Sequence, residues 1–195
     1  MGDGTVRERI LSAALKTATV HGIARLSVGD VARTAGLSRQ TVYKYFPSKD
    51  ALIAAVVLNE ASELVSQVVA AADAVDDPRS ALEAAILAAL VVTREHPLLD
   101  RLVRTEPETL LPLLSVDGGP VMGLVRPVVE EIVGRKLPDL SPVQTRRLAD
   151  VITRLLVSYA IAAPDDPPEV VAASVAALLT GGVPSNLTAP ARRPE

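Results

Sequence analysis

The side chains best suited to chemistry lie close together in residues 27–49, SVGDVARTAGLSRQTVYKYFPSK. Arg39 and Gln40 can each bond a base edge through two atoms, to guanine and to adenine respectively. Tyr43 and Lys44 suit phosphate oxygens, which fix the register of a protein on DNA without reading its sequence. This combination of side chains indicates binding to a nucleic acid.

Small and apolar residues in the same segment predict two short helices joined by a tight turn. Ser27 and Ser38 stand where N-caps are expected, and Gly36 stands where a helix can end in the left-handed conformation. Ala32 allows the helices to cross closely, and Val42 fills the core that they share. The second helix could then enter the major groove with its N-terminal residues at the base edges.

If Val42 and Phe46 face the core, the opposite side of the second helix is free for DNA. We expect its first three residues at base edges and the following tyrosines and lysines along phosphates. An ordinary helical hairpin with a solvated charged face is the alternative, but it leaves the order of caps and turn unexplained. The predicted DNA contacts are Ser27, Ser38, Arg39, Gln40, Thr41, Tyr43, Lys44, Tyr45 and Lys49.

This segment resembles the DNA-binding domain of the tetracycline-repressor (TetR) family. The run TVYKYFPSKDAL at 41–52 is close to the family's usual Tyr-x-His-Phe followed by Ser-Lys-Glu-x-Leu. Gln40 stands where the family often has Gly or Ala, so a base preference cannot be carried over. Tyr45 stands where His is common, which should preserve a phosphate contact. The resemblance covers about the first 50 residues and implies a homodimer on a palindromic double-stranded operator.

Charge is divided unevenly along the chain, whose net charge is −3. Residues 1–50 carry eight basic and four acidic side chains, whereas the remainder carries twelve basic and nineteen acidic ones. Residues 1–50, called the head from here on, are thus basic and the rest of the chain is acidic. This division indicates that only the head binds a polyanion.

The sequence does not support an enzyme. The chain has no Cys, which excludes disulfides, thiolate metal sites and a Cys nucleophile. His21 and His96 stand at predicted helix ends, where His96 is expected to cap carbonyls, and neither belongs to a helical His/Glu pair. We see no Gly-rich phosphate loop and no nucleophile–base pair, and we expect no cofactor and no metal.

The expected location is the cytoplasm. No run of about 18 uncharged apolar residues suggests a membrane span, and the start, MGDGTVRERI, lacks the apolar core of a secretory signal.

Apolar residues recur at helical spacing to about residue 180, and no alternating strand pattern interrupts them. The predicted fold is all-α with about nine helices. Residues 1–50 are expected to form the helix-turn-helix domain, 51–182 a helical effector-binding and dimerisation domain, and 183–195 a disordered tail.

Residues 170–179, VVAASVAALL, contain a single polar residue, so a helix here must be covered on several sides. The resemblance implies that the last two long helices of each subunit pair into a four-helix bundle. The expected interface residues are Leu148, Val151, Ile152, Leu155, Leu156, Val171, Val175 and Leu178.

The aliphatic helices between about 80 and 163 are explained mostly as core, and the resemblance adds a pocket for a small apolar molecule. Met122, Arg126 and Tyr159 are the expected ligand contacts, although a structural hydrogen bond is the simpler role for the two polar residues. Three hypotheses follow: a repressor released by a ligand, a DNA-binding regulator without an effector, and a helical carrier or enzyme that has inherited the head. A pocket would separate the first two, and absence of DNA binding would favour the third.

Overall fold

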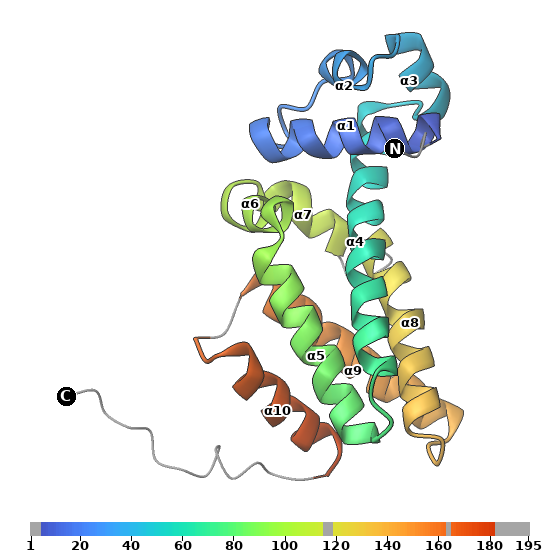
Figure 1. Cartoon of the computed structure of the whole chain (residues 1–195), viewed down its shortest axis with the longest axis vertical. Helices are drawn as coiled ribbons and strands as arrows, with labels where there is room; N and C mark the ends of the chain where they lie inside the picture. Colours follow the sequence, from blue (N-terminus) through green and yellow to red (C-terminus); the bar gives the residue numbers. More distant parts are fainter. Residues whose placement is uncertain (1–4, 115–118, 163–164, 182–195) are drawn as a thin grey trace, which may run out of the picture. The chain divides into compact units, whose positions relative to one another are not determined.

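The computed structural model describes residues 5–114, 119–162 and 165–181, which form ten α-helices and no strand (Figure 1). The all-α prediction is confirmed, with one helix more than expected. The predicted tail, 183–195, lies outside the described residues. The helices are α1 (Val6–His21), α2 (Val28–Ala35), α3 (Arg39–Tyr45), α4 (Lys49–Asp73), α5 (Pro78–Glu95), α6 (Pro97–Thr105), α7 (Pro107–Leu114), α8 (Pro120–Lys136), α9 (Pro142–Ile161) and α10 (Pro168–Leu179).

The helices gather into two compact units whose borders cross α4 and α8. The first unit contains Met1–Glu63 and Glu95–Val125, and the second contains Leu64–Arg94 and Arg126–Glu195. The three N-terminal helices therefore share a unit with α6, α7 and the beginning of α8. These compact units divide the chain differently from the predicted domains 1–50 and 51–182, which stay a prediction.

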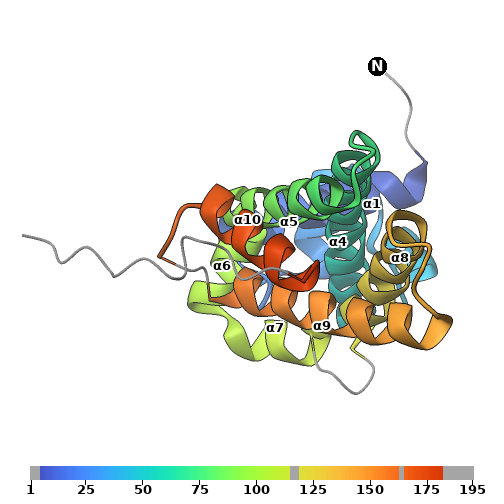
Figure 2. The same ribbon diagram turned by 90° about the horizontal axis from the view of Figure 1, so that it is seen from below.

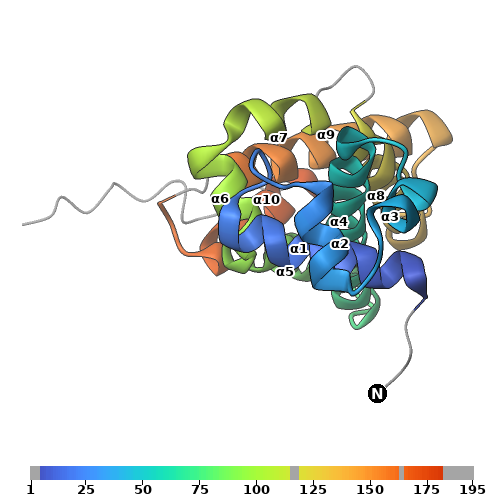
Figure 3. The same ribbon diagram turned by 90° about the horizontal axis from the view of Figure 1, so that it is seen from above.

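The first unit has a continuous apolar core. Ile10 of α1, Val31 of α2 and Val42 of α3 are fully buried in it, together with Leu52 of α4 and Leu102 of α6. Figure 3 shows α1 between α2 and α6, and α1 contacts both helices. Burying each such aliphatic side chain stabilises the fold by about 1.5–3 kcal/mol, so the core holds the helix-turn-helix against α6.

The second unit contains α5, α9 and α10, which lie near one another in Figure 2, and the ends of α4 and α8. Ala72, Ala85 and Ile132 form a small buried cluster in this unit. α9 begins with a capping box: Ser141 accepts a hydrogen bond from the Gln144 backbone N–H, and the Gln144 side chain accepts one from the Ser141 backbone N–H.

α4 is long and apolar enough, by length and composition alone, to cross a membrane, with a mean hydropathy of 1.5 in its most apolar stretch. The helix nevertheless carries Glu60 and Glu63. Its N-terminal half contributes Leu52, Val56 and Val57 to the core of the first unit. Core helices of soluble proteins meet the same criteria, so this feature is weak evidence for a membrane span.

Candidate nucleic-acid interface

Two serine caps and one glycine shape the helix-turn-helix, as the sequence predicted. The Ser27 hydroxyl accepts a hydrogen bond from the Asp30 N–H at 3.1 Å and donates one to the Asp30 carboxylate at 2.5 Å. The bond from Ser27 holds the pKa of Asp30 below its usual value. Ser38 accepts from the Thr41 N–H at 3.0 Å. Gly36 ends α2 with φ 64° and ψ 37°, a left-handed conformation that favours glycine.

The inward-facing residues of this motif are also those predicted. Ala32, Val42 and Phe46 are all buried. The Arg7 guanidinium of α1 lies over the Phe46 ring, 5.6 Å from its centroid, which is within cation–π range. Because one side of α3 is fixed in the core, the other side is turned outward.

The outward side of α3 carries polar groups that are open to a partner. Arg39, Gln40 and Lys44 are exposed, and Tyr43 and Tyr45 keep 50% and 43% of their surface. Within the described part of the chain, Gln40 and Lys44 make no hydrogen bond or ion pair. A face of unoccupied donors at the start of a second helix can meet base edges and phosphates together.

Several other predicted or basic groups have partners inside the head. The Thr41 hydroxyl shares a 2.8 Å hydrogen bond with the hydroxyl of the Ser38 cap, so both hydroxyls already have a partner. Arg33 pairs with Asp30 at 2.8 Å. Lys49, predicted along a phosphate, donates to the Ala24 carbonyl oxygen at 2.7 Å. Lys49 therefore has a structural role in the loop between α1 and α2, a role that its place in the sequence does not indicate.

The same loop is also held by a buried carboxylate that no motif in the sequence indicates. Glu106, which follows α6 and is 7% exposed, accepts a hydrogen bond from the Ala24 N–H at 2.8 Å. Its other oxygen lies 3.5 Å from Arg101 Nε and against Gly22, whose φ of 92° also favours glycine. Ala24 and Glu106 are 82 residues apart, so no local pattern could have shown the contact.

A second link joins α4 to α6. His96 caps the N-terminus of α6, where Nδ1 accepts from the Leu99 N–H at 3.3 Å, so the expectation that it caps carbonyls was wrong. A neutral ring that accepts at Nδ1 carries its proton on Nε2, which then donates to Glu60 at 3.1 Å. This hydrogen bond holds the pKa of Glu60 below its usual value.

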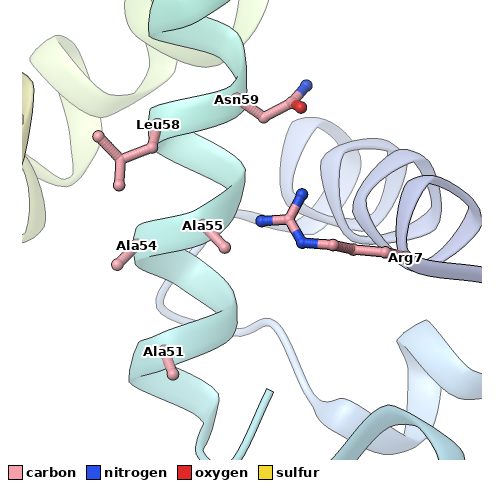
Figure 4. A pocket seen from close by; sticks show the side chains of 6 residues that line it. All are labelled: Arg7, Ala51, Ala54, Ala55, Leu58 and Asn59. Atoms are coloured by element: carbon pink, nitrogen blue, oxygen red, sulfur yellow. The ribbon is translucent and has the colours of Figure 1, made fainter. Parts of the chain in front are cut away.

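An open pocket of about 350 Å³ lies in the first unit (Figure 4). Arg7 reaches from α1 toward small side chains on α4 in this view. The predicted ligand contacts do not line it: Met122 is buried, Arg126 is exposed and Tyr159 is half-buried. The residues that line the pocket are Arg7, Ala51, Ala54, Ala55, Leu58 and Asn59.

The structure separates the predicted dimer contacts into groups. Val151 and Leu178 keep 47% and 52% of their surface, which leaves them available to a partner. Ile152, Val171 and Val175 are at most 8% exposed in the protomer, which leaves little of their surface for a partner, and their place in the interface stays a prediction. The sequence pattern could not separate these groups because core and interface favour the same residue types. Leu148, Leu155 and Leu156 are half-buried.

Comparison with known protein families agrees with this motif and with the helices that follow it. Residues 10–56 match a model of bacterial regulatory proteins of the tetR family. Residues 77–181, more than half of the chain, match the C-terminal domain of the bacterial tetracycline repressor. The chain belongs to the TetR family. Members of this family are DNA-binding transcriptional regulators that act as dimers, and the relatives reported below are named as regulators and not as enzymes.

Among curated relatives, an HTH-type transcriptional regulator of Mycobacterium tuberculosis is 34% identical over 92 residues, 47% of this chain and 46% of that protein. The chain thus spans about half the length of the first curated relatives that it matches. The regulator AlkX of the same organism is 29% identical over 184 residues, 90% of this chain and 83% of the relative.

Solved structures share the fold over nearly the whole chain. The TetR family repressor AlkX of a Dietzia strain, implicated in biodegradation of n-alkanes, has a TM-score of 0.74 at 24% identity and covers 94% of this chain and 100% of that one. RolR in complex with resorcinol has a TM-score of 0.67 at 16% identity, covering 93% and 89%.

Proposed function

We propose that the chain is a repressor that leaves a palindromic operator when a small, largely apolar ligand binds. The observation that carries the DNA-binding half is the outward side of α3, where Gln40 and Lys44 are exposed without partners among the described residues. A protein that acts on operators in this way works in the cytoplasm.

The ligand-binding half has support from the C-terminal helices and from relatives. Residues 77–181 match the C-terminal domain of the tetracycline repressor. RolR, a neighbour in fold, binds resorcinol, and AlkX of Dietzia is implicated in n-alkane breakdown. The helices between about 80 and 163 are rich in aliphatic residues. An apolar ligand suits such a lining.

The first unit contains contacts through which the ligand state could reach the head. Glu106 bonds the backbone of Ala24, and His96 bonds Glu60 of α4. Two recognition helices must sit about 34–36 Å apart to enter successive major grooves. A ligand that favours another separation of the two heads weakens DNA binding by its difference in affinity for the two states.

The alternative is a DNA-binding regulator without a small-molecule effector. The described pocket lies beside the head and not among the helices between 80 and 163, so it does not decide between the two. The two functions differ in what a ligand does to the operator complex.

The test begins with an operator selected from random-sequence duplexes by the purified chain. Straight-chain alkanols and fatty acids, and small phenols such as resorcinol, are then added to the complex while fluorescence anisotropy is followed. A repressor of the proposed kind releases DNA with at least one of these classes. A ligand that binds will raise the melting temperature of the chain. If such ligands leave the affinity for the operator unchanged, the chain is a DNA-binding regulator without a small-molecule effector.

Glu106→Gln tests the route to the head. The substitution removes the charge near Arg101 and keeps an oxygen that can accept from Ala24. We expect the variant to bind ligand as the wild type does and to release DNA less completely. Full release by the variant would exclude this carboxylate from the coupling.

A further inference from the structure

A glycine in α2 leaves the space that an arginine of α3 occupies. Gly29 is the second residue of α2, and Arg39 is the first residue of α3. A Cβ atom built on Gly29 would lie 2.6 Å from Arg39 Nη2 and 2.9 Å from both Cζ and Nε. Three guanidinium atoms at nearly equal distances place the group directly on the Gly29 backbone.

Gly29 is needed here for space. Its φ is outside the left-handed region, so the backbone would accept any L residue. Gly within a helix is less stable than Ala by roughly 0.5–1 kcal/mol. Separations below 3.0 Å are essentially never seen for real Cβ atoms, so an alanine would displace the guanidinium.

The charge of Arg39 has no acidic partner among the described residues. The nearby Asp30 carboxylate already bonds Ser27 and Arg33. Arg39 thus remains an exposed cation whose direction is set by α2 and not by an ion pair. A side chain that lies across α2 is not extended from α3 toward a base.

We propose that Gly29 is a positioning residue for Arg39, and that Arg39 held in this way binds a backbone phosphate and not a guanine edge. This inference rests on the proposed binding of the head to DNA. It changes the expectation that Arg39 reads a base, and it leaves Gln40 as the principal base-reading side chain.

Gly29→Ala tests the positioning with little risk to the fold. The group that must move is the far end of a flexible, exposed side chain, and alanine favours the helix. Gly123→Ala in α8 is the matched control, because a Cβ there meets nothing within 4 Å. We expect both variants to melt at or above the wild-type temperature, and only Gly29→Ala to lose DNA affinity.

The size of the loss follows from counterion release. Log affinity changes with log salt by about 0.9 for each phosphate contact, which corresponds to about eightfold at 0.1 M salt. We expect Arg39→Ala and Gly29→Ala each to lose up to this factor equally on the selected operator and on a scrambled duplex, with a shallower salt dependence. The double variant should lose no more than Arg39→Ala alone, because the two residues act through one contact.

Three results would overturn the inference. A loss by Arg39→Ala confined to the selected operator would make Arg39 a base reader. Unchanged affinity in Gly29→Ala beside a loss in Arg39→Ala would remove the positioning role. A wild-type chain that binds neither duplex at low salt would overturn the proposed function as well. The wild-type isotherm alone distinguishes this outcome from the two results described for the variants.

Discussion

At the scale of single residues, the basic side chains of the head differ in whether they have a hydrogen-bonding partner within the chain. Lys44 is exposed without a bond to any described residue, whereas Lys49 donates to the Ala24 carbonyl. Both were predicted along phosphates, and their types alone do not distinguish them. The hydrogen bonds of the structure leave Lys44 free to bind a phosphate and give Lys49 a part in holding the loop between α1 and α2.

Lys44→Ala and Lys49→Ala should therefore fail differently. Loss of an exposed charge-assisted hydrogen bond should lower the unfolding free energy of Lys49→Ala by about 1 kcal/mol. Lys44→Ala should leave stability unchanged and make the salt dependence of DNA binding shallower by about 0.9 in slope. Urea unfolding and binding isotherms at several salt concentrations measure both effects. Equal stability of the two variants would show that the bond to Ala24 contributes nothing.

At the scale of elements, the sequence predicted the features that depend on near neighbours. Ser27, Ser38 and Gly36 cap or end helices through contacts within a few residues, so the order of residues in the sequence indicates them. Glu106 was not visible, because its partner Ala24 is brought to it by the fold. Contacts between residues that lie far apart in the sequence can be identified only from the tertiary structure.

The bond between Glu60 and His96 joins α4 to α6 and makes a specific contribution in acid. The pKa of Glu60 in the folded chain lies below its ordinary value of 4.5. Its stabilisation is thus complete above that pH and is lost as the pH falls through the lower, folded value. Glu60→Gln should flatten the decline of unfolding free energy below about pH 4.5.

Glu63→Gln is the control for this prediction, since Glu63 is an exposed carboxylate on the same helix. Urea unfolding midpoints measured at successive pH values compare the two variants with the wild type. If both variants decline in acid as the wild type does, the contact with His96 does not stabilise the fold through the charge of Glu60.

At the scale of the whole molecule, the family acts as dimers, and the exposed apolar residues of the last helices offer a surface for this. Val143 and Val151 of α9, and Val170 and Leu178 of α10, each keep 40% or more of their surface. The sequence correctly located apolar helices but could not tell which side faces the protomer. Burial within the chain supplies that distinction for Ile152, Val171 and Val175.

Leu178→Glu and Val151→Glu should each give a folded monomer. Both side chains are about half exposed in the protomer, so a carboxylate is tolerated there but would be buried without a partner in an apolar interface. Sedimentation velocity at micromolar concentration measures the change. Val20→Glu, on an exposed α1 residue, should remain dimeric. Leu178→Glu and Val151→Glu chains that both sediment as dimers would place the interface elsewhere.

The central claim, that the outward side of α3 reads DNA, is tested most directly by Gln40→Ala. Gln40 is neutral and exposed, and its truncation removes hydrogen bonds without changing charge. Binding isotherms on the selected operator and on a scrambled duplex, at several salt concentrations, should show a loss of about 1–3 kcal/mol on the operator alone, with the salt slope nearly unchanged. Equal weakening on both duplexes would mean that this side of α3 does not face the bases.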